Sequence, residues 1–207
     1  MEKVPAGTAI QAVLFDFGGV LAEEGFRAGL KAIAGHFRLA PDKFFAMAEE
    51  AVYGSGYVTG QGSELDFWKT VCQRAGIAAD IAVLRQEILT RFVLRPRMVE
   101  AARRLRRQGL TTVILSDQTD WLDILEARDH FFQEFDHIFN SYYLGTSKRD
   151  PATFDQVVRQ IGRAPGECLF VDDSPGHIGR AASRGLQALL FTGEAAFLAE
   201  LRRLMPF

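Results

Sequence analysis

The chain has 207 residues, of which 48% are hydrophobic, so it can bury a full core as one large domain or as one domain with an insertion. Its 24 basic and 26 acidic side chains give a net charge of −2, which creates no overall field favouring nucleic acid or an acidic membrane surface. No apolar run reaches the roughly 18 residues of a membrane span, and the N-terminal MEKVPAGTAI lacks the apolar stretch of a signal peptide. We therefore expect a cytoplasmic protein whose partner is a small molecule.

An apolar run over residues 9–17, AIQAVLFDF, ends at two glycines and predicts a central strand that is covered on both faces. From about residue 23 to 94 the apolar residues recur at threes and fours, which predicts about four helices and no strand. Pro41 suits the first turn of one of these helices, and Ser63 with Asp66 suits the N-terminal cap of another.

After Pro96 the pattern changes to an alternation of helices and short strands. We expect helices at 97–109, 119–129, 151–162, 175–185 and 194–205, and strands at 111–116, 136–141, 168–173 and 187–191. Such alternation indicates right-handed crossovers and a parallel, doubly wound sheet. The prediction is an α/β fold with a Rossmann-like core of residues 1–21 and 96–207, and a helical cap of residues 22–95 inserted after the first strand.

Charged or hydroxyl side chains follow the predicted strands at their carboxyl ends, where ligands bind in such sheets. These are Asp16, then Ser116 with Asp117, then Lys148 with Arg149 and Asp150, and then Asp172 with Asp173. Carboxylates packed together raise one another's pKa unless a cation lies among them, and hard oxygen ligands suit Mg²⁺. A lysine and a hydroxyl beside that ion would offset the charge of a phosphate group.

Four motifs in chain order, VLFDFGGV, VILSD, TSKRDPATF and CLFVDDSPGHIGRAASRG, resemble motifs one to four of the haloacid dehalogenase (HAD) superfamily. The resemblance spans residues 10–192, and the helical insertion is similar to the C1 cap of the subfamily I phosphatase-like hydrolases. It implies that Asp16 attacks phosphorus and forms an aspartyl-phosphate.

The same resemblance implies a set of ligands for the metal and the substrate. Mg²⁺ would be held by the Asp16 carboxylate, the backbone carbonyl of Gly18 and Asp173, with Asp172 acting directly or through water. The phosphoryl oxygens would be held by Ser116 and Lys148, assisted by the backbone N–H groups of Phe17, Gly18 and Asp117.

Gly18 stands where family phosphatases have a second aspartate, which protonates the leaving alkoxide and then deprotonates the attacking water. Loss of a general acid/base lowers a rate typically by about 10² to 10⁴-fold. The metal needs only the backbone carbonyl at this position, and a branch that resembles sugar-phosphate phosphatases also has a glycine here. Asp117 is the nearest candidate for a replacement acid, or else it caps the helix that starts near Thr119.

Three functions follow, in order of preference. The first is Mg²⁺-dependent hydrolysis of a small phosphate monoester by a monomer or homodimer with no nucleic-acid or membrane partner. The second is a weakened or inactive relative that binds a phosphorylated metabolite or a protein partner. The third is a metal-free dehalogenase, although the family's dehalogenases carry a tyrosine in place of Gly18 and do not need the paired acids Asp172 and Asp173.

Other polar residues admit simpler interpretations. The basic run at residues 103–109 predicts a solvated helix face, and Asp150 suits a helix cap. The four histidines are dispersed and read as structural, with His177 a weak exception because it follows DDSPG. Cys72 and Cys168 belong to no metal or disulfide pattern. Cap residues that could meet the leaving group are Glu23, Glu24, Arg27, His36, Tyr53, Tyr57 and the loop at residues 53–63, although the first two better suit a solvated helix start.

Overall fold

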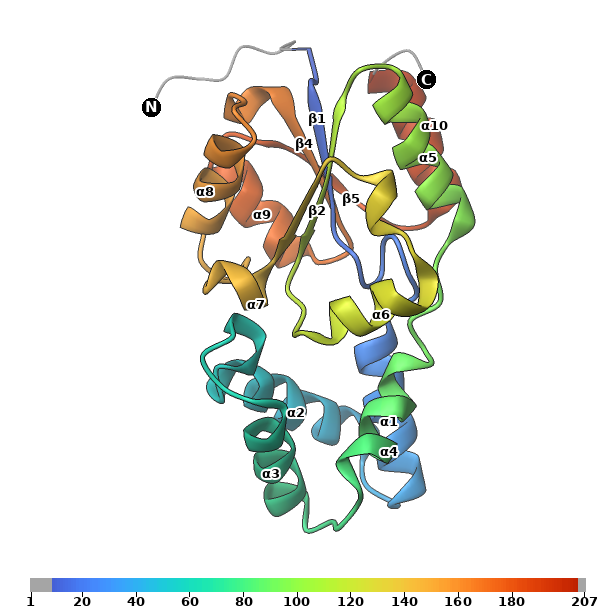
Figure 1. Cartoon of the computed structure of the whole chain (residues 1–207), viewed down its shortest axis with the longest axis vertical. Coiled ribbons are helices and arrows are strands. Elements are labelled where there is room, and N and C mark those ends of the chain that lie inside the picture. The colour runs from blue at the N-terminus through green and yellow to red at the C-terminus, as the bar shows by residue number, and fades with distance from the viewer. Residues whose placement is uncertain (1–8, 205–207) are drawn as a thin grey trace.

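The computed structural model describes residues 9–204, which form an α/β core and a helical unit beyond one edge of its sheet (Figure 1). Five strands in this part of the chain form a parallel sheet in the order β3-β2-β1-β4-β5. They are β1 (Ala12–Phe15), β2 (Thr111–Ser116), β3 (His137–Asn140), β4 (Cys168–Asp172) and β5 (Gln187–Leu190). The chain runs outward from β1 to β3 and then returns to β4, so the strand order reverses beside β1, where such folds bind ligands.

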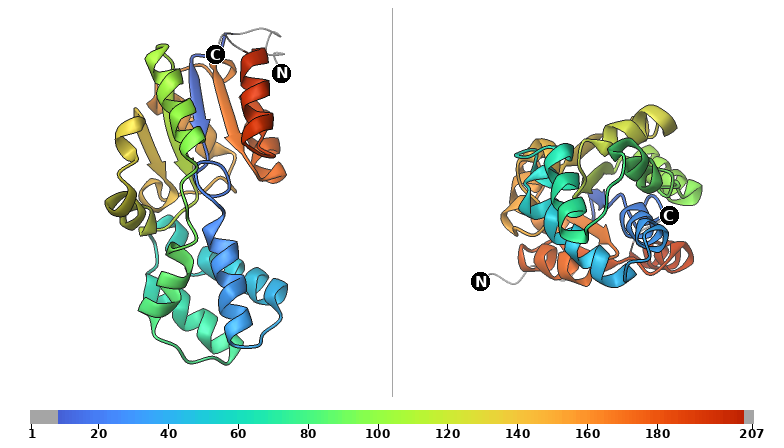
Figure 2. Two further views of the ribbon diagram at one scale, coloured as in Figure 1. Left: turned by 90° about the vertical axis from the view of Figure 1, so that its right-hand side faces the viewer. Right: turned by 90° about the horizontal axis from the view of Figure 1, so that it is seen from below.

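Helices cover both faces of the sheet, because successive side chains of each strand point to opposite sides. Val13 and Phe15 of β1 belong to the same apolar cluster as residues of α5 (Pro96–Arg107), α6 (Trp121–Asp129) and α10 (Glu194–Leu204). Ala12 and Leu14 belong to a second cluster with α8 (Ala152–Gln160) and α9 (Pro175–Ser183). The Rossmann-like, doubly wound core predicted from the sequence is confirmed (Figure 2).

The inserted segment folds as the helices α1 (Gly25–His36), α2 (Pro41–Gly54), α3 (Glu64–Ala75) and α4 (Ile81–Leu89), with a short 3-10 helix at Tyr57–Thr59. Pro41 is the first residue of α2, and Ser63 with Asp66 forms the predicted capping box of α3. The unit lies beyond the carboxyl ends of the strands (Figure 1). The exact division at residues 21/22 and 95/96 stays a prediction.

The entrance and exit of the inserted unit are joined to each other. Ala22 forms an antiparallel bridge with Leu94, the Glu23 N–H donates to the Val93 carbonyl at 2.8 Å, and the Arg95 N–H donates to the Leu21 carbonyl at 2.8 Å. The segment that enters the inserted unit and the segment that leaves it are therefore paired with each other. This pairing sets the position of the unit relative to the sheet.

Local differences from the predicted elements are small. The first strand spans four residues rather than nine, and α6 begins at Trp121 rather than near Thr119. Short elements that carry no periodic signal were not predicted: the 3-10 helices at Phe132–Glu134 and Pro165–Glu167, and α7 (Ser141–Leu144). Asp150 accepts from the Ala152 N–H at 2.9 Å at the start of α8, as predicted.

The surface also agrees with the sequence analysis. Arginines of the basic run in α5 pair with acidic residues: Arg103 with Glu100 and Glu134, Arg106 with Asp136, and Arg107 with Glu100. Both cysteines are free thiols, with Cys168 buried and Cys72 half-buried. None of the helices within residues 9–204 has the length and apolar character of a membrane span. The N-terminal segment considered above lies largely in residues 1–8, outside the described part.

Candidate active site

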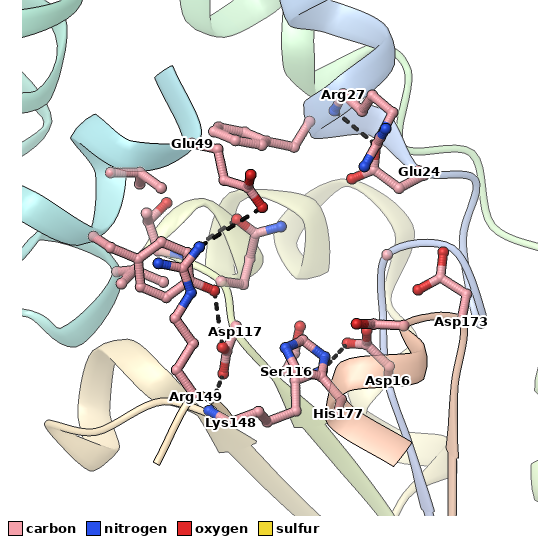
Figure 3. A pocket seen from close by; sticks show the side chains of 18 of the residues that line it. Asp16, Glu24, Arg27, Glu49, Ser116, Asp117, Lys148, Arg149, Asp173 and His177 are labelled. Carbon is pink, nitrogen blue, oxygen red and sulfur yellow. Dashed lines mark hydrogen bonds and ion pairs between the residues drawn. The ribbon is translucent and has the colours of Figure 1, made fainter. Parts of the chain in front are cut away.

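Polar residues from separate strands meet at the carboxyl edge of the sheet, as predicted. A cavity of about 490 Å³ lies there, between the sheet and the inserted helices (Figure 3). Of the residues predicted for the site, Asp16, Gly18, Ser116, Asp117, Lys148 and Asp173 line this cavity. The parallel strand order explains the convergence, since it places the ends of β1, β2 and β4 side by side.

Lys148 lies between two of the predicted acids and forms a buried charge triad with them. Its ammonium group is 2.9 Å from Asp16 Oδ1 and 2.7 Å from Asp172 Oδ2. Burial would by itself lower the pKa of Lys148 and raise that of Asp172, but the opposite charges outweigh it. The pKa of Lys148 is therefore raised and that of Asp172 is held well below its usual range, so both stay ionised.

Asp16 remains different from Asp172 in two respects. Burial, reinforced by the charges of Asp172 and Asp173, raises its pKa well above the usual value in spite of Lys148. Its Oδ1 accepts from the Phe17 N–H at 2.7 Å and from Lys148, while Oδ2 has no hydrogen-bond partner among residues 9–204. The predicted donor Phe17 N–H thus points at Asp16, and its buried ring lies outside the cavity lining.

Asp172 is fully engaged within the protein. Besides Lys148, it accepts from the Ser174 N–H at 2.7 Å and lies 3.1 Å from His177 Nδ1. His177 sits in the first turns of α9, and the start of that helix brings position 177 back onto the preceding acid. The DDSPGH sequence was the only signal for this contact, and it is a weak one.

Asp173 faces the cavity from beside the glycine loop. Its carboxylate packs so closely on Gly19 that a Cβ there would collide with it, and Gly19 has a φ of +83°, which suits glycine. Burial and the charge of Asp172 raise the pKa of Asp173. The Asp173 carboxylate has no ion pair with another side chain of the described chain. Asp173 thus adds a third carboxyl group to the two that already share Lys148.

Two sets of donor groups could hold a cation. Donor atoms of Asp16, Asp172 and His177 lie within 4.8 Å of one another, but Asp172 and His177 already contact each other. The second set is Asp16, the Gly18 carbonyl and Asp173, which offers hard oxygen donors at the edge of the cavity.

Ser116 and Asp117 occupy the end of β2. The Ser116 side chain is 2% exposed and lines the cavity. Asp117 does not cap α6, so that interpretation is wrong. Its Oδ1 instead accepts from the Lys148 N–H at 2.8 Å and its Oδ2 from the Tyr53 hydroxyl at 3.0 Å. With both oxygens occupied, Asp117 is poorly placed to act as a replacement acid.

The inserted unit supplies the opposite wall of the cavity. Tyr53 hydrogen-bonds Asp117, and the Arg149 guanidinium lies 3.3 Å over the Tyr53 ring and 3.7 Å from Glu49 (Figure 3). The predicted cap residues Glu24, Arg27 and Tyr53 line the cavity.

Three other predicted cap residues lie elsewhere. Glu23 pairs with Arg95, the buried Tyr57 donates to Asp120, and His36 packs edge-on against Phe37. Glu49 was not predicted, because its position in a helical pattern shows only that it is polar.

Known proteins share this sequence in part. The chain is 29% identical over 128 residues to bifunctional epoxide hydrolase 2 of Rattus norvegicus, covering 58% of this chain and 23% of that protein. It is 31% identical over 116 residues to a sesquiterpene phosphatase of Aspergillus oryzae, covering 54% of this chain and 59% of that protein. The chain thus spans less than two thirds of these curated relatives.

Solved structures share the fold. A HAD family enzyme of Bacteroides thetaiotaomicron, crystallised with magnesium and inorganic phosphate, matches with a TM-score of 0.70 at 19% identity, covering 88% of this chain and 94% of that one. An L-2-haloacid dehalogenase of Xanthobacter autotrophicus matches with a TM-score of 0.66 at 18% identity, covering 95% and 85%. With residues 10–183 matching the family's sequence pattern, the chain belongs to the haloacid dehalogenase-like hydrolases.

Proposed function

We propose that this hydrolase cleaves a small phosphate monoester in a Mg²⁺-dependent reaction, with Asp16 as the nucleophile. The observation that carries the proposal is the state of the Asp16 carboxylate. One oxygen is fixed by Lys148 at 2.9 Å and by a backbone N–H at 2.7 Å, and the other has no partner within residues 9–204. A buried carboxylate that faces a cavity with one oxygen unengaged is suited to attack a bound electrophile.

The residues around Asp16 suit a phosphoryl group. Lys148 is 1% exposed and stays protonated, so it presents a fixed positive charge to the equatorial oxygens. Ser116 adds a hydroxyl donor from the neighbouring strand. Asp172 holds Lys148 in place through its 2.7 Å contact, and this positions the ammonium group without using the Asp172 carboxylate for substrate.

The donor set fits magnesium. Asp16, Asp173 and the Gly18 carbonyl provide oxygen ligands, and burial together with neighbouring carboxylates raises the pKa of both acids, a repulsion that a bound cation would relieve. When bound there, Mg²⁺ would stabilise negative charge on the phosphoryl oxygens. Gly18 needs no side chain for this role. The buried Lys148 lies between Asp16 and Asp172, so we assign the ion to the Asp173 side of Asp16.

Similar proteins support the phosphate assignment. One relative is a phosphatase by name. The structural neighbour crystallised with magnesium and inorganic phosphate shares the fold at 19% identity and bears on architecture alone. The dehalogenase neighbour shares the fold at 18% identity, which bears on architecture alone. The Asp173 carboxylate, unpaired and beside Asp16, favours a metal-assisted reaction over metal-free dehalogenation.

A second candidate function is binding of a phosphorylated ligand without turnover. The observation that favours it is the absence of a side chain at Gly18 together with the engagement of both Asp117 oxygens.

The two functions are separated by assaying para-nitrophenyl phosphate with and without Mg²⁺, alongside Asp16→Asn. We expect Mg²⁺-dependent release of phosphate that Asp16→Asn abolishes while the circular dichroism spectrum is unchanged. Phosphate binding without turnover would favour the second function, and activity retained by Asp16→Asn would remove Asp16 from the mechanism.

A further inference from the structure

The space beside residue 18 is filled by a ring from the other end of the inserted unit. A Cβ on Gly18 would lie 3.2 Å from Phe92 Cε1, a distance tighter than ordinary van der Waals contact. Phe92 is 1% exposed, lines the cavity and also packs closely on Gly25. Position 18 therefore carries no acid, and Phe92 occupies the space beside it that an acidic side chain would need. A proton donor for the leaving group has to come from another wall of the cavity.

Most other acidic groups in the cavity are already engaged. Asp117 accepts hydrogen bonds at both oxygens, from Lys148 and Tyr53. Glu49 is ion-paired with Arg149 at 3.7 Å. Asp173 lies on the sheet side, next to the nucleophile.

Glu24 is the remaining carboxyl group of the cavity lining in the described chain. Its Oε2 accepts from the Arg27 N–H at 2.7 Å at the start of α1, and Oε1 has no hydrogen-bond partner within residues 9–204. Figure 3 shows Glu24 on the inserted unit's side of the cavity and Asp16 on the sheet's side. In an in-line displacement the leaving oxygen lies opposite the attacking oxygen, which is the side of Glu24.

We propose that Glu24 is the general acid and base of this hydrolase, in place of the side chain that Gly18 lacks. The inference rests on the proposed function. In the first step Asp16 Oδ2 forms a bond to phosphorus, the bond from phosphorus to the leaving oxygen breaks, and the Glu24 proton passes to that oxygen. In the second step Glu24 takes a proton from water, the water oxygen bonds to phosphorus, and the bond from phosphorus to Asp16 breaks.

The surroundings of Glu24 suit a group that changes protonation near neutral pH. Burial raises the pKa of Glu24, the Arg27 N–H and charge lower it, and the charges of Asp173 and Glu49 add to the rise, which together bring the pKa to about 7. The Arg27 N–H fixes one oxygen of the carboxyl group, so the other oxygen is the one that carries the proton.

The test is Glu24→Gln, which keeps an oxygen to accept from the Arg27 N–H and so preserves the start of α1. The matched control is Glu23→Gln, because Glu23 pairs with Arg95 and does not line the cavity. Each protein is assayed with Mg²⁺ on para-nitrophenyl phosphate, whose leaving group departs without a proton, and on alkyl phosphates of graded leaving-group basicity.

We expect Glu24→Gln to lower kcat/KM on alkyl phosphates by about 10² to 10⁴-fold. The value of kcat/KM on para-nitrophenyl phosphate should stay close to wild type, because this ratio covers only the steps up to release of the leaving group and not the second step, in which Glu24 acts as base. The dependence of rate on leaving-group basicity should steepen in this variant and stay unchanged in Glu23→Gln.

An equal loss of kcat/KM on both substrate types, or no loss of kcat/KM on alkyl phosphates, would overturn the assignment of Glu24. So would a wild-type protein that cleaves only the aryl ester, because its acid step would then be absent. A wild-type protein that cleaves neither substrate would overturn the proposed function itself, and the role of Glu24 with it.

Discussion

Replacing Lys148 with methionine probes the buried charge triad directly, and its outcome does not depend on knowing the substrate. The ammonium group lies 2.9 Å from Asp16 and 2.7 Å from Asp172, whose side chain is 0% exposed. At such separations an effective dielectric constant of about 20 gives roughly 6 kcal/mol of attraction for each pair, before the cost of desolvation. Removing one partner of a buried ion pair costs about 3 to 5 kcal/mol, because it leaves an unpaired buried charge. We expect that loss in the free energy of unfolding of Lys148→Met at neutral pH.

The loss should depend on pH in a defined direction. In the wild type Lys148 holds the pKa of Asp172 well below its usual range, so this acid's stabilisation persists until the pH is very low. Without Lys148, burial raises the pKa of both Asp16 and Asp172 above their values in the unfolded chain. Stability from a raised pKa is present at low pH and is lost as the pH rises through the folded pKa. The difference in the free energy of unfolding between wild type and Lys148→Met should therefore widen from acid to neutral pH.

Urea unfolding followed by circular dichroism at about pH 4.5 and pH 7.5 measures this gap on both sides of the titration. Adding Asp172→Asn to Lys148→Met should recover part of the stability, since it removes one of the two unpaired charges. Arg149→Met serves as control, because this exposed arginine should contribute less than about 1 kcal/mol. A loss below about 1 kcal/mol for Lys148→Met, or a loss that is the same at both pH values, would refute the triad.

Three further outcomes are expected. Gly19→Ala should lower the free energy of unfolding, followed by thermal unfolding, by about 1 to 2 kcal/mol, because Gly19 has a φ of +83°. It should also raise the Mg²⁺ concentration needed for activity, because the new Cβ would displace Asp173. An unchanged Mg²⁺ requirement would contradict that placement of Asp173. Tyr53→Phe removes the 3.0 Å hydrogen bond to Asp117, which is worth roughly 1 to 3 kcal/mol, and should speed amide hydrogen exchange in α2. Unaltered exchange would show that this hydrogen bond does not hold the inserted unit against the core. The value of kcat/KM on alkyl phosphates should fall as the pH rises through about 7, because Glu24 loses the proton that it gives to the leaving group. Glu24→Gln should abolish that fall, and a fall that persists in the variant would assign it to another group.

The convergence of Asp16, Ser116 and Asp172 could be predicted because it follows from local patterns and from one general rule. Each residue ends an apolar, strand-like run, and parallel strands bring their carboxyl ends to one edge. The helical character of the inserted segment follows equally from its periodicity, as do the caps at Pro41 and Ser63. These properties depend on neighbours within a few residues, so one sequence is enough to read them.

The pairing of polar groups across the cavity depended on tertiary structure. Asp117 looked like a helix cap because capping is the local use of such a residue, yet it bonds Tyr53 and the Lys148 backbone, 64 and 31 residues away. The contact of His177 with Asp172 likewise depends on how α9 leaves the sheet.

The sequence by itself determined the doubly wound core, the position of the helical insertion and the acids at the sheet edge. Only the packing of the inserted helices against that edge placed Phe92 beside Gly18 and brought Glu24 into the cavity opposite Asp16. The physical reason is the distance along the chain over which each property is set. Periodicity and strand order are set by backbone geometry and local burial. The environment of a titratable group is set by the distant chain segments that exclude water from it.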